Sequence, residues 1–415
     1  MESIADKLKS LGVLRGVNGI NKQEPTKSSI FPIEQILLGE WESHNHGDIF
    51  TVTKRYPRDY QHGSVKFDQS TNLNIIAAYA NDPRIAQVNL KDIAFLDTET
   101  TGLIGGTGTY TFLIGIGRFV DEFFENKQFF LREPSEETTQ LAAIESYLAP
   151  CNTIVTYNGK SFDVPLLNTR FALNSFPTPL SNLSHIDLLH LSRKLWRLRL
   201  PSRTLGDIEA KILNLKRSGD DVPGWMIADY YYDYLHTGDA RPLINVFYHN
   251  EIDVVSLAAL LIHISQLLSD PLEYPIKHGL DVISIARLYA DIGDLENAIK
   301  LYRRGIAYQD LEEPHLQYAI KQLSFLEKKR GDYEQAIPLW EIAAGKGEIY
   351  AHVELAKVYE HTYRQYDKAE SWTQSAIKII QSSSFPKYER LNLLPELEHR
   401  INRIWRKQGK KHNEK

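Results

Sequence analysis

The sequence predicts an α/β protein in which a mixed sheet flanked by helices is followed by an all-α helical-repeat domain. Three observations lead to this expectation. Short apolar, strand-like segments alternate with helical segments from residue 91 to about 270. Helical periodicity fills residues 283–380, and a motif recurs within them. A chain of 415 residues with 42% hydrophobic and 24% charged side chains has room for roughly two or three globular domains.

The elements preceding residue 91 are the least regular. Residues 1–30 are polar and without periodicity, so we expect a flexible lead. Residues 31–90 contain a strand-like piece at 47–56 and a possible helix at 71–80. We interpret them as an extension that packs on the domain that follows.

The domain at 91–270 should begin with strands in hairpin order and continue with helices. Acidic residues in the first turn support a helix in SEETTQLAAIESYLA, and a further strand and helix follow in NTIVTYNG and FDVPLLNTRFALN. The three expected hairpin strands are IAFLDTE, TYTFLIGIGRF and EFFENKQFFLR. Hairpins followed by a helix and another strand indicate a mixed sheet covered by helices. A long helix over 243–269 closes this domain.

The region at 280–385 repeats. The segments IGDLENAIKLY, RGDYEQAIPLW and RQYDKAESWTQ align with offsets of 38 and 33 residues, each with a small Ala three positions after a large residue. Stacked helix pairs need such a small residue where two helices touch, and the period resembles that of tetratricopeptide repeats. An irregular helical bundle is the alternative. Residues 386–415 are expected to form a helical, basic tail that adds nonspecific affinity or ends in disorder.

Composition excludes several classes. The single cysteine, Cys151, excludes an internal disulfide framework and a multi-cysteine zinc site. We find no apolar run long enough to span a bilayer and no signal-peptide core, so we expect a cytoplasmic protein. The net charge of −5 gives no overall attraction to nucleic acid, so any such binding must come from local basic patches.

Four acidic residues carry the chemistry. Asp97 and Glu99 should point to the same side at the end of one strand, because side chains alternate along a strand. Close carboxylates repel each other, and divalent cations with a preference for hard oxygen ligands, Mg²⁺ or Mn²⁺, would resolve this conflict. Asp163 begins a helix and Asp253 lies on a late one. Each has an ordinary alternative, a solvated strand end, a helix cap or a surface acid, but together they predict a metal site.

The motifs FLDTETTGL, YNGKSFD and HNEID resemble those of the DnaQ-like (DEDD) 3′–5′ exonucleases, which have a ribonuclease-H-like fold. The bacterial YprB-type branch, which includes a mitomycin-repair exonuclease, is the more similar one, because it shares the GLIGGTGTY stretch and a helical-repeat C-terminus. The resemblance implies that the metal-binding acids are Asp97, Glu99, Asp163 and Asp253, with two Mg²⁺ or Mn²⁺ ions among them. One ion activates water in that family, and the pair stabilises the attacking and leaving oxygens.

The general base is expected to be His249. The family places either Tyr or His at set spacings before its last Asp, and this sequence fits neither spacing. On a continuous helix His249 shares a face with Asp253, four residues on, whereas Tyr248 diverges from it. Histidine side chains titrate near neutral pH, which suits proton removal from water. Tyr248 would then stack or pack.

Substrate contacts are expected in two places. The resemblance suggests that the backbone around the glycine stretch, at Thr100, Thr101, Gly102 and Leu103, and Asn158 approach the terminal nucleotide. Tight-turn geometry is the alternative for Gly105, Gly106 and Gly108. The stretch 191–206 has Trp196 among five basic residues and could hold phosphates and stack a base, or could be a helix with a solvated face. These five residues are Arg193, Lys194, Arg197, Arg199 and Arg203. Asp187 is either an acid near the site or a helix cap.

The expected function is therefore a metal-dependent 3′–5′ exonuclease acting on nucleic acid, DNA more than RNA. The resemblance further suggests DNA repair, with a protein partner such as a helicase on the repeats. An RNA-processing exonuclease or structure-specific endonuclease of the same fold, and a noncatalytic nucleic-acid-binding scaffold that acts through its repeats, are the alternatives. An intact set of four mutually repelling acids argues against the scaffold.

Overall fold

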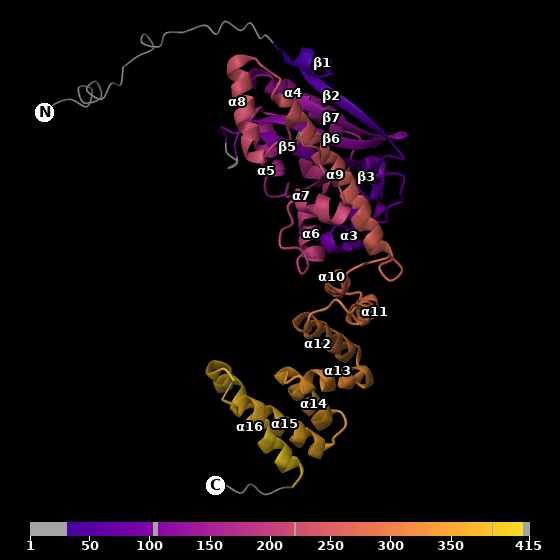
Figure 1. Cartoon of the computed structure of the whole chain (residues 1–415), viewed down its shortest axis with the longest axis vertical. Coiled ribbons are helices and arrows are strands. Elements are labelled where there is room, and N and C mark those ends of the chain that lie inside the picture. Colours follow the sequence, from indigo (N-terminus) through magenta and orange to yellow (C-terminus); the bar gives the residue numbers. More distant parts are fainter. Residues whose placement is uncertain (1–30, 103–106, 220, 384, 410–415) are drawn as a thin grey trace, which may run out of the picture.

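A seven-stranded mixed sheet forms the body of the protein, and an arm of helices extends from it (Figure 1). The computed structural model describes residues 31–102, 107–219, 221–383 and 385–409, so the expected flexible lead at 1–30 lies outside the described residues. The sheet order is β1 (Glu40–His44), β2 (Gly47–Pro57), β7 (Phe123–Phe130), β6 (Thr111–Val120), β5 (Ile93–Thr100), β8 (Thr153–Thr156) and β9 (Ser184–Asp187). The predicted fold class, a ribonuclease-H-like mixed sheet followed by an all-helical region, is confirmed.

The sheet changes direction at β5. Strands β1, β2, β7, β6 and β5 are antiparallel neighbours, whereas β8 and β9 run parallel to β5. Residues 31–90 do more than pack against this sheet. Their β1–β2 hairpin pairs with β7, with Phe50 opposite Phe130, and extends the sheet by two strands. A two-stranded ribbon, β3 (Gln61–His62) and β4 (Val65–Lys66), and α3 (Asn74–Ala80) complete this segment.

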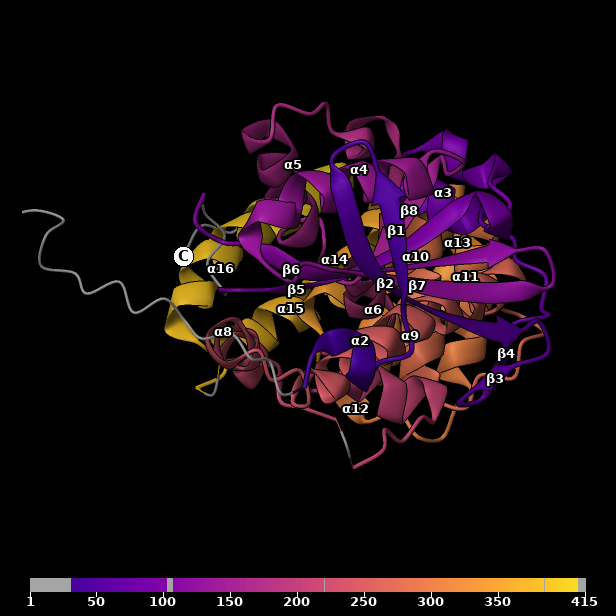
Figure 2. The same cartoon turned by 90° about the horizontal axis from the view of Figure 1, so that it is seen from above.

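Alternation along β5 divides the core between the two faces of the sheet. Ala94 and Leu96 pack in the core that includes residues of α4 (Glu137–Leu148) and α5 (Asp163–Leu173). Ile93 and Phe95 pack in the core with α6 (Leu188–Trp196) and α9 (Leu243–Ser269). Seen from above, α4 and α5 lie on one side of the sheet and α9 on the other (Figure 2). A third core gathers α2 (Ile33–Ile36) and α8 (Ile227–Thr237) against the first residues of α9.

Helix α9 is the spine of this domain. Its length and apolar composition would allow it to cross a membrane, contrary to the expectation that the sequence has no such run. However, 72% of its most apolar window is buried inside the protein. We therefore describe it as the central core helix, with its apolar side chains covered by the sheet and by α6.

The arm consists of helix pairs with the predicted repeat. The aligned residues Leu295, Tyr333 and Tyr366 are the first residues of α11, α13 and α15, and the aligned alanines are fully buried. The helices of the arm are α10 (Gly279–Asp291), α11 (Leu295–Ile306), α12 (Glu313–Arg330), α13 (Tyr333–Gly345), α14 (Ile349–His361), α15 (Tyr366–Gln381) and α16 (Lys387–Lys407). The prediction of an all-helical C-terminal region is confirmed, and its described helices form three consecutive pairs and a final helix.

The arm is attached to the sheet domain by apolar packing. The core that contains α6 and α9 continues without a break into α10 and α11, through Val282, Ile283 and Leu301. Two ion pairs reinforce the junction: Arg199 Nε lies 2.8 Å from Asp281 Oδ1, and Lys194 binds Asp291. The division of the chain into domains at about 270–280 stays a prediction, since one core serves both parts.

Candidate active site

The end of β5 presents two carboxylates on the face that α9 covers. Asp97 lies opposite Gly115 of β6 and Glu99 opposite Leu113, and the register shifts immediately after Glu99. Both acids follow the alternation of Ile93 and Phe95, so they share one face as predicted. Asp97 is half-buried and Glu99 is 9% exposed.

Two glycines of β6 allow α9 to approach the sheet at this point. A Cβ on Gly115 would lie 2.2 Å from Asn250 Oδ1, and one on Gly117 would lie 2.7 Å from Val254 Cγ1. Helix α9 therefore needs glycine at both positions. The close approach places Asn250 Nδ2 2.9 Å from Asp97 Oδ2, while Gln128 holds the Asn250 amide by donating to its Oδ1 at 3.0 Å. The segment GIG of the sixth strand thus fixes Asp97 relative to α9.

A tight turn between β8 and α5 positions the third acid, Asp163. Asn158 has φ of +68°, and a Cβ on Gly159 would lie 2.5 Å from Thr156, so the chain can turn sharply from β8 into α5. Asp163 is the first residue of α5, and its Oδ1 accepts a 2.6 Å hydrogen bond from Thr98 Oγ1. The acid from the strand–helix junction is thereby joined to the strand that carries Asp97 and Glu99.

The Asp187 carboxylate holds this turn in place through hydrogen bonds to the backbone. Its carboxylate accepts the backbone N–H groups of Asn158 at 2.8 Å and Lys160 at 3.1 Å. It also caps α6 by accepting from Leu189 N at 3.1 Å. Both sequence-based interpretations of Asp187 hold: it caps α6, and it lies near the site, where it holds the Asp163 turn and helps to raise the pKa of Asp163.

The four predicted acids interact electrostatically. Burial, followed by repulsion from Asp253 and the other acids, raises the pKa of Asp97 and of Glu99 well above their ordinary values. Burial also raises the pKa of Asp163 to about 6, against the lowering effect of its hydrogen bond to Thr98. The pKa of Asp253 is raised by burial, although Arg217 and His249 oppose this. The negative charge of the four carboxylates is not fully balanced by nearby positive groups. A bound cation would reduce the repulsion among them.

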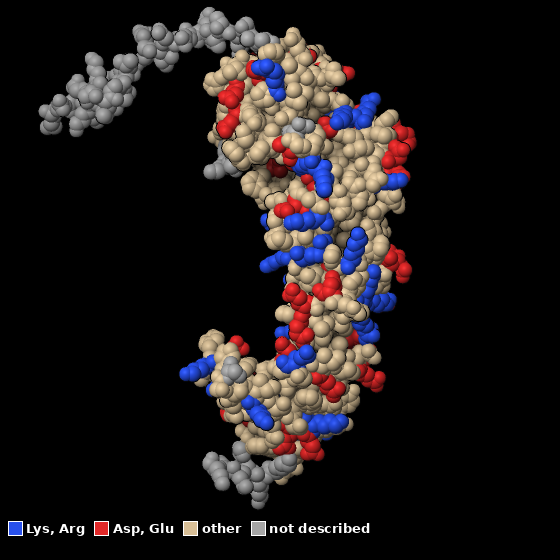
Figure 3. Space-filling view, in the orientation of Figure 1, with Lys and Arg blue, Asp and Glu red and all other residues tan. Residues whose placement is uncertain are grey.

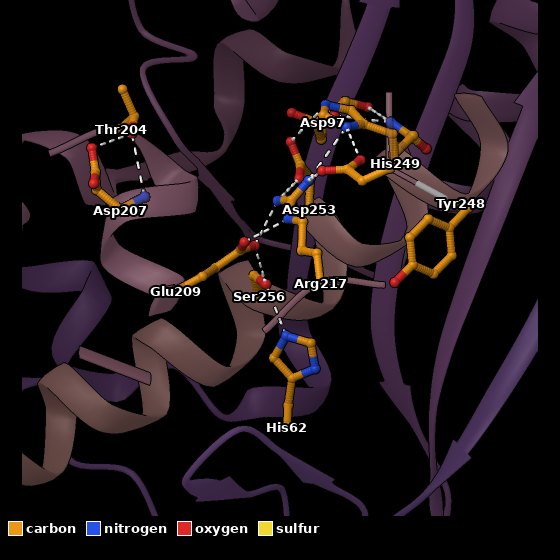
Figure 4. A network of polar contacts seen from close by, with 12 residues as sticks. His62, Asp97, Thr204, Asp207, Glu209, Arg217, Tyr248, His249, Asp253 and Ser256 are labelled. Atoms are coloured by element: carbon orange, nitrogen blue, oxygen red, sulfur yellow. Dashed lines mark hydrogen bonds and ion pairs between the residues drawn. The ribbon is translucent and has the colours of Figure 1, made fainter. Parts of the chain in front are cut away.

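A buried ion-pair relay supports Asp253 (Figure 4). Arg217 Nη2 donates to Asp253 Oδ1, and its Nε and Nη2 donate to the two oxygens of Glu209 at 2.6 and 2.7 Å. Glu209 is 1% exposed and also accepts a 2.5 Å bond from Ser256 Oγ, which contacts His62 Nε2 at 2.8 Å. No sequence pattern predicts these ion pairs. Arg217 lies in the polar, aperiodic segment NLKRSGDDVPG, which carries no recognisable signal.

His249 faces Asp253, as predicted for an unbroken helix. Helix α9 runs continuously through both residues, and His249 Nε2 lies 3.7 Å from Asp253 Oδ2. Tyr248 points away from the acids (Figure 4), and its hydroxyl accepts the N–H of Ser218 at 3.3 Å. His249 Nδ1 lies 2.6 Å from Asp221 Oδ1. Arg217 Nη1 lies 3.3 Å from the same nitrogen. Because a carboxylate accepts, the Asp221 contact favours the tautomer with the proton on Nδ1, in which the lone pair of Nε2 faces Asp253.

The four carboxylates are chemically suitable ligands for a divalent cation, but their side chains are not already arranged around a metal position. Among the described residues, no group of three His, Cys, Asp or Glu side chains converges as a ready metal site. One oxygen each of Asp97, Asp163 and Asp253 is engaged by Asn250, Thr98 and Arg217. The donor set nevertheless consists of carboxylates that repel one another, and such oxygens are the preferred ligands of Mg²⁺ and Mn²⁺.

The residues at the end of β5 that we expect to contact the substrate lie where the loop between β5 and β6 begins. Thr101 N donates to Tyr110 O at 3.0 Å, and Thr100 Oγ1 donates to Gly102 O at 2.9 Å. Leu103, Gly105 and Gly106 lie outside the described residues. The open neighbourhood of Gly108, with nothing within 4 Å of a Cβ placed there, shows no packing need for glycine at that position.

The basic stretch of residues 191–206 divides into two parts. Lys194 and Arg199 form the ion pairs with the arm, and Trp196 is 2% exposed in the core, so the predicted stacking of a base on Trp196 is wrong. Leu195 and Leu200 are buried as well, which explains why this helix resembles a core element. Arg193 and Arg197 are exposed. Asn158, Arg193 and Arg203 line a pocket of about 550 Å³ beside the Asp163 turn.

Comparisons with known proteins identify the class of the sheet domain. The sequence profile of the RNase H superfamily matches residues 94–265, the segment that carries all four acids and His249. The domain is therefore of the RNase H-like class of nucleic-acid-processing hydrolases. The chain is also 31% identical over 393 residues to YprB, an uncharacterized protein of Bacillus subtilis (strain 168), with 89% of this chain and 91% of YprB covered. The chain belongs to the YprB family.

A solved structure shows a weaker likeness. It is that of the family B DNA polymerase from the hyperthermophilic archaeon Pyrobaculum calidifontis, with 16% sequence identity and a TM-score of 0.33. The match covers 59% of this chain and 34% of the polymerase chain. A likeness of this size supports no inference about function.

Proposed function

We propose that this protein is a metal-dependent 3′–5′ exonuclease that hydrolyses phosphodiester bonds, with DNA as its main substrate. One observation carries the proposal: Asp97, Glu99, Asp163 and Asp253, from β5, α5 and α9, have raised pKa values and lie close enough to act on one another electrostatically, and His249 lies beside Asp253. Such uncompensated carboxylates weaken a fold, so their presence at one sheet edge supports a chemical role. The 3′–5′ direction rests on the resemblance of the three acidic motifs to the DEDD exonucleases.

The four carboxylates would hold the cations. Two bound Mg²⁺ or Mn²⁺ ions would supply a water of lowered pKa and stabilise charge on the attacking and leaving oxygens. Asn250 orients Asp97, and Thr98 orients Asp163, so two of the ligands are held in place before substrate arrives. This second layer of hydrogen bonds is what a metal-binding carboxylate requires for a fixed orientation.

His249 would act as the general base. Its Nε2 faces the cluster and can accept a proton from the attacking water, while Asp221 keeps the proton on Nδ1 and stabilises the imidazolium that forms. Tyr248 points away from the acids (Figure 4), which favours His249 over Tyr248 for this role. The Arg217 guanidinium, held by Glu209, reduces the repulsion that Asp253 contributes to the site.

The substrate strand would pass between the β5–β6 loop and the pocket beside Asn158. The start of the β5–β6 loop, at Thr100–Gly102, would approach the terminal nucleotide. The pocket lined by Asn158, Arg193 and Arg203 would bind the neighbouring phosphate. A role in DNA repair, a helicase as partner of the arm, membership of the arm in the tetratricopeptide class and a cytoplasmic location belong to the same proposal. The repair role and the helicase rest on the sequence resemblance, the tetratricopeptide class on the repeat period, and the location on the composition.

End-labelled substrates test the proposal. Purified protein is incubated with single-stranded DNA, duplex DNA and RNA, each labelled at the 5′ end or the 3′ end, with Mn²⁺ and with Mn²⁺ plus a chelator. We expect a ladder of shortened 5′-labelled DNA and early loss of label from 3′-labelled DNA, both abolished by the chelator. Internal cuts as first products, degradation from the 5′ end, or faster degradation of RNA would each contradict part of the proposal.

A further inference from the structure

The β3–β4 ribbon reaches into the core of the sheet domain. His62, the last residue of β3, is 1% exposed, and the ribbon lies beside α9 (Figure 1). The RNase H profile matches residues 94–265, so the ribbon lies outside that match. A polar side chain from the N-terminal segment is therefore buried within the domain that carries the acids.

The ribbon contacts the segment that carries Glu209. Glu209 begins a π-helix, Glu209–Leu213, directly after α7 (Leu205–Ile208), and short π-helical turns are frequent at functional sites. Ser64 N donates to Leu213 O at 2.7 Å. A Cβ on Gly63, whose φ is +59°, would lie 2.1 Å from the same oxygen. The ribbon therefore needs glycine at position 63 to approach the end of this π-helix.

His62 is joined to Asp253 by an unbroken series of hydrogen bonds and ion pairs (Figure 4). Ser256 Oγ donates to Glu209 Oε1 at 2.5 Å, because a carboxylate that is paired with an arginine only accepts. The single hydroxyl hydrogen of Ser256 is thus used, which favours His62 Nε2, 2.8 Å away, as the donor to Ser256. Burial lowers the pKa of His62 to about 4, so its ring is neutral at pH 7 and can adopt this tautomer.

Glu209 limits the pull of Arg217 on Asp253. Arg217 donates through Nε and Nη2 to both oxygens of Glu209, and its Nη2 also donates to Asp253 Oδ1. If the Glu209 carboxylate turned away, the guanidinium would keep Asp253 and Asp221 as its partners and would pair with them more strongly. A carboxylate held tightly by a cationic side chain is a weaker ligand for a divalent ion, because the two positive charges repel each other.

The series of contacts is shielded from water. Glu209 and Ser256 are 1% and 0% exposed, whereas on the face shown in Figure 3 Lys and Arg side chains lie among Asp and Glu at the surface. Water and salt screen charges at a surface, but they screen buried pairs much less. Loss of one buried hydrogen bond therefore affects the neighbouring groups of the network.

We propose that His62 is a positioning residue of the active site, through which the β3–β4 ribbon raises the affinity of Asp253 for a divalent cation. His62 holds the Ser256 hydroxyl on Glu209. Glu209 in turn restrains Arg217, which leaves one oxygen of Asp253 available to the cation. The cation belongs to the proposed function, on which this inference rests.

Manganese binding to the full-length chain, without nucleic acid, tests the inference. Free Mn²⁺ is measured by electron paramagnetic resonance along a titration, and Asp97→Ala identifies the binding that belongs to the acids. His62→Phe keeps a ring but has no N–H, and His62→Gln restores a donor close to the place of Nε2. His263→Phe is the matched control, because His263 is a second buried histidine with a pKa lowered to about 4, and it contacts Trp196 outside the network.

We expect His62→Phe to bind Mn²⁺ about tenfold more weakly than the wild type, the lower end of the loss that follows removal of a hydrogen bond behind a metal ligand. His62→Gln and His263→Phe should bind as the wild type does. Glu209→Gln should lower the affinity too, and the addition of His62→Phe should then have no further effect, because both changes act through one network. Thermal unfolding establishes that each variant is folded. If His62→Phe is not, Ser256→Ala, which removes the hydroxyl from Glu209, takes its place with the same expectation.

Four results would overturn the inference while the metal site stands. They are wild-type affinity in His62→Phe, an equal loss in His263→Phe, no recovery in His62→Gln, and additive losses in the variant that combines His62→Phe with Glu209→Gln. Absence of Mn²⁺ binding in the wild type would contradict the proposed function, and the inference with it.

Discussion

Substitution of Gly115 by alanine should uncouple α9 from the acid-bearing strand. The new Cβ would lie 2.2 Å from Asn250 Oδ1 and 2.9 Å from Val254 Cγ2, so the Asn250 oxygen has to retreat by about 1 Å to reach ordinary van der Waals contact. Either α9 moves away from β6 or the Asn250 amide rotates. Both movements break the 2.9 Å hydrogen bond from Asn250 Nδ2 to Asp97 Oδ2 and shift Asp253 relative to Asp97.

The magnitude follows from this displacement. Overpacking of a well-packed core costs about 1–3 kcal/mol of unfolding free energy. A misplacement of about 1 Å among reacting groups lowers catalysis roughly 10²-fold. We therefore expect Gly115→Ala to remain folded, with a lower urea midpoint, and to lose about two orders of magnitude in kcat/KM on 5′-labelled single-stranded DNA.

Gly345→Ala is the matched control, because a Cβ at that helical position has nothing within 4 Å. It should leave both the urea midpoint and kcat/KM close to those of the wild type. If Gly115→Ala behaves like this control in both measurements, then α9 does not depend on glycine for its approach, and the proposed coupling of Asp97 to α9 is refuted.

Three further predictions follow from the same contacts. Asp97→Ala should abolish nuclease activity while the urea midpoint stays the same or rises, because a repelling carboxylate is removed; full activity would exclude Asp97 as a metal ligand. His249→Ala should lower turnover by roughly two to four orders of magnitude, and Tyr248→Phe should have a mild effect; the opposite ranking would make Tyr248 the base. Burial raises the pKa of Glu360, but Arg403 and Lys407 more than offset this and lower it to about 2, so its ionised form stabilises the arm above the unfolded-state pKa near 4.5. Glu360→Gln should therefore lower the thermal midpoint at pH 7, and the difference should shrink as the pH falls from about 4.5 toward 2; a constant difference would contradict the ion-pair role.

Local sequence patterns were sufficient for the elements and for the acids. Period-two alternation in IAFLDTE places Asp97 and Glu99 on one face, and an unbroken apolar helix places His249 beside Asp253. The pattern in the arm was also visible, because the three aligned alanines, Ala298, Ala336 and Ala369, are all fully buried. These features depend on spacing along the chain, which a sequence displays directly.

Features set by long-range packing could not be read in the same way. Arg217 reaches Asp253 across 36 residues from a polar segment, and nothing in its neighbourhood distinguishes it from a solvated loop residue. The β1–β2 hairpin joins the sheet because β7 has a free edge, which is a property of topology and not of the hairpin's own sequence. Lys194 and Arg199 looked like phosphate ligands since their partners, Asp291 and Asp281, lie far along the chain.

The central claim is that the four carboxylates hold divalent cations. Diffraction data collected at the manganese absorption edge from crystals soaked in Mn²⁺ test it most directly. We predict anomalous peaks among Asp97, Glu99, Asp163 and Asp253, and loss of these peaks in crystals of the Asp97→Ala variant. An anomalous map without a peak at these side chains, or with peaks only elsewhere on the protein, would contradict the claim.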